Sequence, residues 1–419
     1  MTTAAQRRYE SGMAGVDEAV TIDAIASKIF SPQNLLERAE QAAVIAEAHA
    51  AAVDADGRYP AEAMSAIREN RLLGIMVPTA YGGESASVSR IADVCYILGQ
   101  SCASTAMIYA MHQVKAACLI DHAAGQPSME SFMRRVAAEQ LLIASSTTEG
   151  NNGGNVRSSE GAVRRDGDRF TLDRNASCIS YGESADALMT TARRDPSAPN
   201  ADQVLVVVHK DDYTLTPTGG WDTLGMRGTV SAGFQLHVDA SFEQVMNVPY
   251  AGIHTQSMVP TAHIFWTSVW AGIAAAALEK ARRFVRMVSR KSGGNPPPGA
   301  LHMTRAMSAH TMLRALIEQT ARKYEAIKHD PDAINGMDFQ NEIVALKVDA
   351  SEMAADIVMK AMRAGGLAAY RLDGEFSIAR HLRDILAAPI MIHNDRILGG
   401  AIASSMMREV PRRLTAEVQ

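Results

Sequence analysis

Helical periodicity dominates this chain on both sides of one internal segment whose pattern is typical of β-strands. Between about Ser145 and Val248, short alternating or apolar runs such as 204–208 are separated by turn signals such as Thr218-Gly219-Gly220. Outside that segment, apolar residues recur at helical spacing in stretches rich in Ala, Leu and Met. The pattern therefore predicts an α+β, mainly α protein with a small β domain between two helical regions.

The same pattern divides the chain into four segments. We expect a flexible N-terminal tail over residues 1–30, a helical domain over 31–144, a β domain over 145–250 and a second helical region over 251–419. The first expected helix begins at 31, and the last begins at 378 with a break near Pro389. The helices expected between them span 60–74, 87–122, 128–138, 260–289, 301–328 and 341–362. The linker 293–299, rich in Gly and Pro, cannot be helical.

Composition and charge mainly exclude certain partners and sites. The chain has 419 residues and a net charge of -5, so nothing in its charge indicates nucleic acid or an anionic membrane as a partner. The four cysteines show no CxxC spacing, which favours reduced thiols and gives no metal site. No targeting segment is visible. The apolar stretch 264–278 is shorter than the ~20 residues of a membrane span. We therefore expect a core helix there and a cytoplasmic protein.

Five motifs follow one another along the chain. They are Pro60-Ala61-Glu62 through Leu72-Leu73-Gly74, Val77-Pro78 and Tyr81-Gly82-Gly83; Ser101 to His112; Thr148-Glu149-Gly150-Asn151-Asn152-Gly153; Gly225-Met226-Arg227-Gly228-Thr229; and Gly365-Gly366 with Arg380-x-x-Arg383-Asp384. Together they resemble, over roughly residues 35–410, the acyl-CoA dehydrogenase superfamily, including the flavin-dependent monooxygenases that share its fold. The resemblance implies a helical N-terminal domain, a central small β-barrel or β-sandwich, and a C-terminal four-helix bundle.

The resemblance also implies a flavin, with FAD as the first choice and FMN or a diffusible reduced flavin as the second. The protein would orient the flavin and tune its electronics. Seven residues fall at or near the family's flavin contacts: Thr148, Gly153, Cys178, Ser180, Arg305, Gly365 and Gly366. Taken singly, the hydroxyls of Thr148 and Ser180 are equally typical of turns, and Arg305 is equally typical of a solvated helix face.

Several positions depart from the family pattern. Cys178 stands where a Trp usually packs on the flavin, and Met362 replaces a Gln. The linker 293–299 replaces a stretch whose Arg contacts the FAD pyrophosphate from a neighbouring subunit, which makes Arg305 a candidate substitute. These departures are the reason for keeping FMN and a diffusible flavin open.

The largest departure concerns the catalytic base. Dehydrogenation of an acyl thioester needs a carboxylate to take the α-proton while hydride moves to flavin N5. The two positions that carry this Glu in the family align with Ile392 and Ala262, and neither can act as a base. His393 and Asp395 are the nearest groups of suitable type and are the candidate catalytic residues. Structural roles, a satisfied helix histidine and a pair with Arg396 or a helix cap, are equally open for them.

Two further residues are candidates for the substrate pocket. His112 lies on an apolar helix, where a core role is also open, and Arg227 lies in the Gly-Met-Arg-Gly-Thr turn, where it can equally orient the loop. For Arg380, Arg383 and Asp384 we expect an ion pair that locks the fold.

The resemblance implies a flavin-dependent oxidoreductase and leaves three functions, of which its extent favours the first and the missing Glu favours the second. The first is α,β-dehydrogenation of an acyl thioester on CoA or a carrier protein. The second is a two-component flavin-dependent monooxygenase, which needs no Glu but needs a dry cavity that protects the reactive flavin. The third is a flavin-binding protein without turnover. The resemblance further implies a homo-oligomer, a tetramer or dimer, and a flavin reductase or an electron-transfer flavoprotein as partner.

Overall fold

The N-terminal part of the chain is helical. The computed structural model describes residues 34–150, 155–410 and 412, so the tail expected over 1–30 lies outside the described residues. Cys102 is extended, with φ -144° and ψ 112°, so the single helix expected over 87–122 is two helices that meet at this residue. The elements here are α3 (Leu35–Asp56), α4 (Ala61–Glu69), a 3-10 turn (Thr79–Tyr81), α5 (Val88–Ser101), α6 (Ala103–His122) and α7 (Pro127–Glu139).

The central strands form two four-stranded sheets, in the orders β1-β4-β5-β8 and β2-β3-β7-β6. In β3, burial alternates along the strand, as expected when one face packs on the core and the other faces solvent. In β4 and β5 nearly every residue is buried, because other elements cover both faces. The strands are β1 (Ile143–Ser146), β2 (Arg164–Asp166), β3 (Arg169–Ala176), β4 (Ala187–Arg193), β5 (Gln203–His209), β6 (Tyr213–Pro217), β7 (Phe234–Ser241) and β8 (Val245–Pro249).

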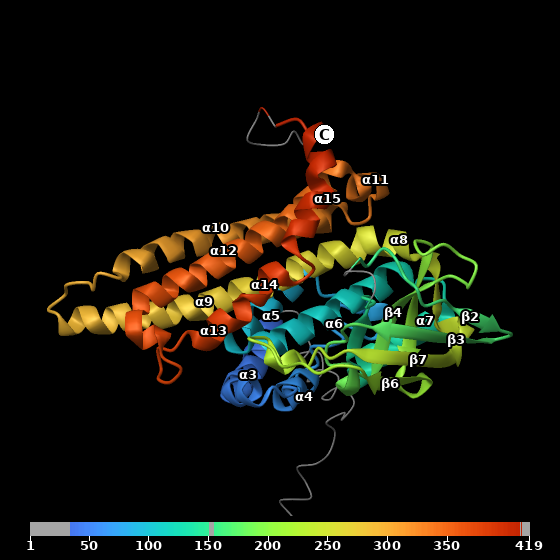
Figure 1. Cartoon of the computed structure of the whole chain (residues 1–419), viewed down its shortest axis with the longest axis horizontal. Coiled ribbons are helices and arrows are strands. Elements are labelled where there is room, and N and C mark those ends of the chain that lie inside the picture. The colour runs from blue at the N-terminus through green and yellow to red at the C-terminus, as the bar shows by residue number, and fades with distance from the viewer. Residues whose placement is uncertain (1–33, 151–154, 411, 413–419) are drawn as a thin grey trace, which may run out of the picture.

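The C-terminal part is a bundle of long helices. Figure 1 shows α9, α10 and α12 lying alongside one another, while α15 extends away from them. The continuous helical stretch Tyr250–Lys291 is long and apolar enough to cross a membrane, but 83% of its most apolar part is buried inside the protein. The elements are α8 (Tyr250–Ile253), a π-helix (His254–Met258), α9 (Val259–Lys291), α10 (Ala300–Ile327), α11 (Pro331–Asn335), α12 (Met337–Tyr370), α13 (Ala379–Ile385), α14 (Ala387–Ile390) and α15 (Asn394–Met407).

A close helix crossing joins the two helical parts. On α5, a Cβ added to Gly99 would lie 2.6 Å from the Val269 carbonyl oxygen. On α9, a Cβ added to Gly272 would lie 2.4 Å from the Tyr96 carbonyl oxygen. Real Cβ atoms do not approach other atoms this closely, so only glycine fits at these two positions. The fold expected from the sequence is confirmed: a helical domain, a β domain and a helical bundle packed together.

Candidate functional site

The loop after β1 is anchored by a buried carboxylate. Glu149 is 4% exposed and accepts hydrogen bonds from the backbone N–H groups of Glu160 and Gly161 at 2.5 and 3.1 Å. Its side chain also lies 3.5 Å from the buried guanidinium of Arg174. Because these contacts fix Glu149, they also fix the backbone of Thr148, whose side chain is half-buried. Gly153 lies outside the described residues.

The same loop lies against the end of β3. Glu149 forms a β-bridge with Ala176, and the Gly150 N–H donates to the Asn175 carbonyl at 3.2 Å. Cys178 lies two residues after Ala176 and is half-buried. Burial raises the pKa of its thiol, while the hydroxyls of Ser180 and Ser231 lower it. The structure therefore brings the Thr148 loop and Cys178 to the same end of the β domain.

Three hydroxyls form a hydrogen-bonded chain beside Cys178. Ser180 Oγ lies 2.8 Å from Ser231 Oγ, and Ser231 Oγ lies 2.8 Å from Thr229 Oγ1. Thr229 Oγ1 donates in turn to the Met226 carbonyl at 2.8 Å. Each hydroxyl has one proton to give, so when Thr229 donates to Met226 the chain leaves Ser180 with a free acceptor position. Reversal of the chain makes Ser180 a donor, and Ser180 can therefore serve either kind of partner.

The Gly-Met-Arg-Gly-Thr turn is held by the N-terminal helices. Arg227 Nε donates to the Asp54 carbonyl at 2.7 Å, and its Nη1 lies 2.9 Å from the Asp222 carboxylate. The Gly228 N–H donates to Ser104 Oγ at 3.1 Å. Arg227 thus points to α3 and to its own loop, which favours the loop-orienting role over a role in the substrate pocket.

The Arg383–Asp384 motif locks the same turn from the other side. Arg383 pairs with Asp54 on α3 and donates to the Leu224 carbonyl at 2.9 Å. Asp384 is 5% exposed and accepts from the Met226 N–H at 2.7 Å. Burial is the largest cause that raises the pKa of Asp384, to about 6. The fold-locking role expected from the sequence is therefore present, with Asp54 as the partner of the arginine.

His112 is a core residue. It is fully buried, and its two ring nitrogens lie 2.8 Å from the Leu73 carbonyl oxygen and 3.0 Å from the Ile143 amide nitrogen. An N–H must donate to His112 Nδ1, so Nε2 carries the proton and donates to Leu73. Burial lowers the pKa of this ring to about 4. Both nitrogens are engaged, which favours the core role over a place in a substrate pocket.

The structure does not bring His393 and Asp395 to the hydroxyl chain. Both side chains are exposed at the start of α15, which packs on α12. Ile392 and His393 have φ values of 53° and 54°, and the chain turns sharply there. Ala262, which the resemblance aligns with the family's other Glu position, is 3% exposed on α9. The catalytic roles of His393 and Asp395 stay predictions.

Arg305, Gly365 and Gly366 lie on the helical bundle. Arg305 is exposed on α10, and Gly365 is buried near the end of α12. Gly366 has φ 54° and ψ -138°, which breaks the helix at that residue. These residues belong to the bundle, whereas the Thr148 loop follows β1 of the β domain.

Two buried lysines were missed by the sequence analysis. Lys347 is fully buried and donates to Asn394 Oδ1 at 2.6 Å and to the Ala388 carbonyl at 3.1 Å. Lys115, on α6, is 3% exposed. The available signal was a lysine inside an otherwise apolar helical stretch, as in Val114-Lys115-Ala116.

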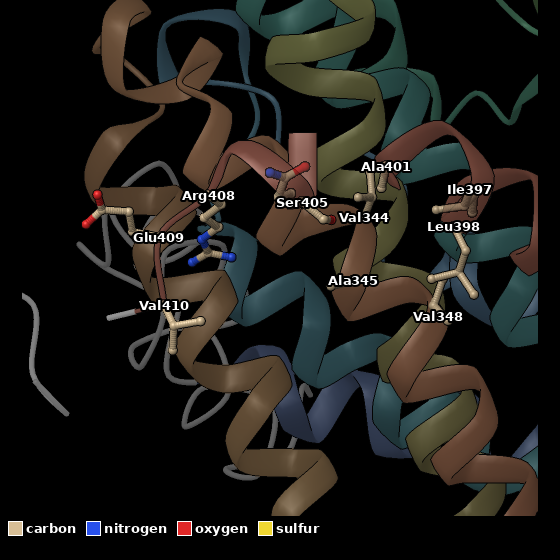
Figure 2. A pocket seen from close by; sticks show the side chains of 11 residues that line it. Val344, Ala345, Val348, Ile397, Leu398, Ala401, Ser405, Arg408, Glu409 and Val410 are labelled. Atoms are coloured by element: carbon tan, nitrogen blue, oxygen red, sulfur yellow. The ribbon is translucent and has the colours of Figure 1, made fainter. Parts of the chain in front are cut away.

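A groove elsewhere on the bundle is apolar. It lies between α12 and α15, has a volume of about 370 Å³, and is lined by residues that include Val344, Val348, Leu398 and Ala401. Figure 2 shows these side chains facing the same space. None of the expected flavin-site residues that the structure describes lines it.

Comparisons with known proteins identify the family of this chain. The family model of the acyl-CoA dehydrogenase N-terminal domain matches residues 34–140, and that of the C-terminal domain matches residues 263–407. The cyclohex-1-ene-1-carbonyl-CoA dehydrogenase of Geobacter metallireducens is 27% identical over 55% of this chain, which spans 61% of that relative's length. The chain belongs to the acyl-CoA dehydrogenase family.

Solved structures of two different kinds share the fold. TdsC from Paenibacillus sp. A11-2, a dibenzothiophene monooxygenase, superposes in its FMN-bound form with a TM-score of 0.78 at 18% identity, covering 90% of this chain and 98% of its own. Butyryl-CoA dehydrogenase from Megasphaera elsdenii gives 0.76 at 18% identity, with the same coverage. At such identities the likeness shows the fold alone.

Proposed function

We propose that this protein is a flavin-dependent oxidoreductase whose flavin lies at the end of the β domain formed by Thr148, Cys178 and Ser180. The support is that the hydroxyl chain joins Ser180 to the segment of Thr229 and Ser231, and that a β-bridge holds the Thr148 loop against Ala176, four residues before Ser180. Membership of the family adds to it. A flavin supplies two-electron redox chemistry when bound. The chain's own contribution is to hold the ring edge through Ser180 and to close the site with the Gly225–Thr229 turn.

Of the possible reactions, monooxygenation with reduced flavin and O2 fits the geometry best. The observation that carries this choice is the state of the carboxylates. Glu149 is engaged by backbone N–H groups and Arg174, and Asp384 accepts from Met226. The resemblance aligns the family's two base positions with Ile392 and Ala262, and neither side chain is a base. Monooxygenation inserts one oxygen atom into the substrate and reduces the other to water, and it needs no carboxylate at these positions.

The hydroxyl chain is consistent with a reduced flavin. Oxidised flavin N5 accepts a hydrogen bond, whereas the reduced form carries an N5–H that donates one. The arrangement Ser180 to Ser231 to Thr229 to the Met226 carbonyl leaves Ser180 as an acceptor and suits the reduced form. The reversed arrangement suits the oxidised form.

A second candidate is α,β-dehydrogenation of an acyl thioester. The sequence relatives favour it, because the Geobacter relative is named a dehydrogenase. This reaction requires a relocated base, and His393 and Asp395 are the candidates. Because both are exposed in a single chain, their use would require that a second copy or a substrate cover the start of α15.

The remaining features of the proposal concern cofactor, partners and assembly. FAD stays the first choice of cofactor, with FMN or a diffusible reduced flavin as the second. A reductase partner goes with monooxygenation and an electron-transfer flavoprotein with dehydrogenation. A homo-oligomer is supported by an exposed apolar stripe on α15 with helical spacing, Leu398, Ile402 and Met406. A cytoplasmic location also stays part of the proposal.

The proposed flavin site is tested by flavin affinity. Ser180→Ala should weaken binding of FMN or FAD at least about fivefold, the loss of one hydrogen bond of about 1 kcal/mol. Ser177→Ala is the matched control, because Ser177 is an exposed serine three residues away. Fluorescence titration measures both. Equal affinities for the two variants would contradict the placement of the flavin.

A further inference from the structure

Lys115 is a buried cation without an anionic partner among the described residues. Lys115 is 3% exposed, and its ammonium lies 3.7 Å from the sulfur of Met258. Burial lowers the pKa of Lys115 to about 8, and the nearby Cys118 thiol acts in the opposite direction and raises it. Asp121, on the same helix, accepts instead from Ser257 Oγ at 2.6 Å. Burying a charge in this way is costly unless something neutralises it.

Met258 Sδ receives a second strong donor. The Tyr250 hydroxyl, also buried, donates to the same sulfur at 3.2 Å. A thioether is a weak acceptor, so an ammonium and a phenol are both directed at an atom that satisfies neither well. Met258 ends the π-helix His254–Met258, and π-helical turns occur frequently at functional sites. The flexible thioether can move aside and leave both donors facing the same space.

Further basic side chains lie near Met258 and its two donors. His254, 6% exposed, has its pKa lowered to about 3 by burial and then by Arg157, His263 and Lys115. Arg157 is exposed and comes from the segment that follows the Thr148 loop. We call Lys115, His254 and Arg157 the basic cluster. It contains a surface cation, a buried neutral imidazole and a buried ammonium.

We propose that the basic cluster binds a carboxylate of the ligand, with Lys115 and the Tyr250 hydroxyl as the donors that Met258 now occupies. Two carboxylate oxygens accept from two donors and neutralise the single buried charge. Arg157 would attract the anion at the surface. The identity of this ligand as an acidic substrate rests on the proposed function, whereas the anion site itself does not.

The test separates a ligand site from a structural lysine. Lys115→Met keeps the length of the side chain and removes the charge, and Lys347→Met is the matched control, because Lys347 is equally buried but donates to Asn394 and Ala388. Without ligand, Lys115→Met should raise Tm, because an unneutralised charge is lost. Lys347→Met should lower Tm, because two buried acceptors lose their donor.

Butyrate, butyramide and sodium chloride at equal ionic strength are the probes. Butyrate should raise the Tm of the unmodified protein and of Lys347→Met, but not that of Lys115→Met, and the other two probes should have no such effect. A CoA thioester with a distal carboxylate is the acidic ligand that the second candidate function would supply: glutaryl-CoA should bind at least tenfold tighter than pentanoyl-CoA, and Lys115→Met should remove the difference. A lower Tm for Lys115→Met together with an unchanged butyrate shift would overturn the anion site.

Flavin binding, followed by absorbance on the same samples, keeps the two proposals apart. A protein that binds no flavin but shows the Lys115-dependent butyrate shift would refute the proposed function and leave the anion site standing. A flavin-loaded protein with the butyrate shift but equal affinity for glutaryl and pentanoyl thioesters would refute the acidic thioester as the ligand.

Discussion

Asp384→Asn tests how the turn over the proposed flavin site is held. In the folded protein the pKa of Asp384 is raised to about 6, against about 3.9 in an unfolded chain. The folded state therefore binds more protons between these values, and the stability that this group contributes is full below about pH 4 and lost as the pH rises through about 6. The shift corresponds to about 3 kcal/mol at pH 7.

Asparagine removes the charge but keeps an oxygen that accepts from the Met226 N–H. Asp384→Asn should therefore gain stability relative to the unmodified protein as the pH rises from about 4 to about 7, by up to about 3 kcal/mol. Asp384→Ala is the control. It loses the acceptor as well as the charge, so it should be less stable than Asp384→Asn by about 1–3 kcal/mol at every pH.

Urea unfolding at a series of pH values measures these differences. A difference between Asp384→Asn and the unmodified protein that stays constant from pH 4 to pH 7 would refute the reasoning. It would mean that Arg380 and Arg383 keep the carboxylate charged in the folded state, against the cost of burial.

Three further predictions concern single side chains. The unfolding free energy of Lys115→Met should exceed that of the unmodified protein by about 3 kcal/mol at pH 7. The difference should disappear between about pH 8 and about pH 10.4, because the unmodified lysine is then neutral and no longer has the cost of a buried charge. A difference that persists at pH 10.5 would contradict the buried ammonium. Gly272→Ala should cost about 1–3 kcal/mol in urea unfolding, because its Cβ would meet the Tyr96 carbonyl; a neutral effect would mean that α5 and α9 separate easily. His393→Ala should lower turnover much more than Tm if His393 is the relocated base, and equal losses would exclude that role.

The arrangement of helices and strands could be predicted from the sequence because long periodic segments signal it strongly. The linker 293–299 and the apolar run 204–208 predicted a helix break and a buried strand, and both are present. The division of 87–122 into two helices could not be seen. Cys102 carries no breaker signal, and its extended conformation is set by tertiary packing.

The site was accessible to sequence reasoning only where a motif fixed it locally. Thr148, Cys178 and Ser180 do converge, because backbone bridges join their segments. The partner of Arg383 is Asp54, 329 positions away, and no spacing rule reaches that far. Lys115 escaped notice for a similar reason, since its lack of a counterion is a property of the packed interior.

The visible spectrum of the purified protein, before and after anaerobic addition of an acyl-CoA panel, tests the central claim most directly. The account predicts bound flavin, after reconstitution if necessary, that no thioester bleaches, followed by turnover when reduced flavin and O2 are supplied. Bleaching of the flavin by one thioester would contradict the monooxygenase assignment and establish dehydrogenation with a relocated base. Failure to bind FAD, FMN or reduced flavin at all would contradict the claim that this is a flavin-dependent enzyme.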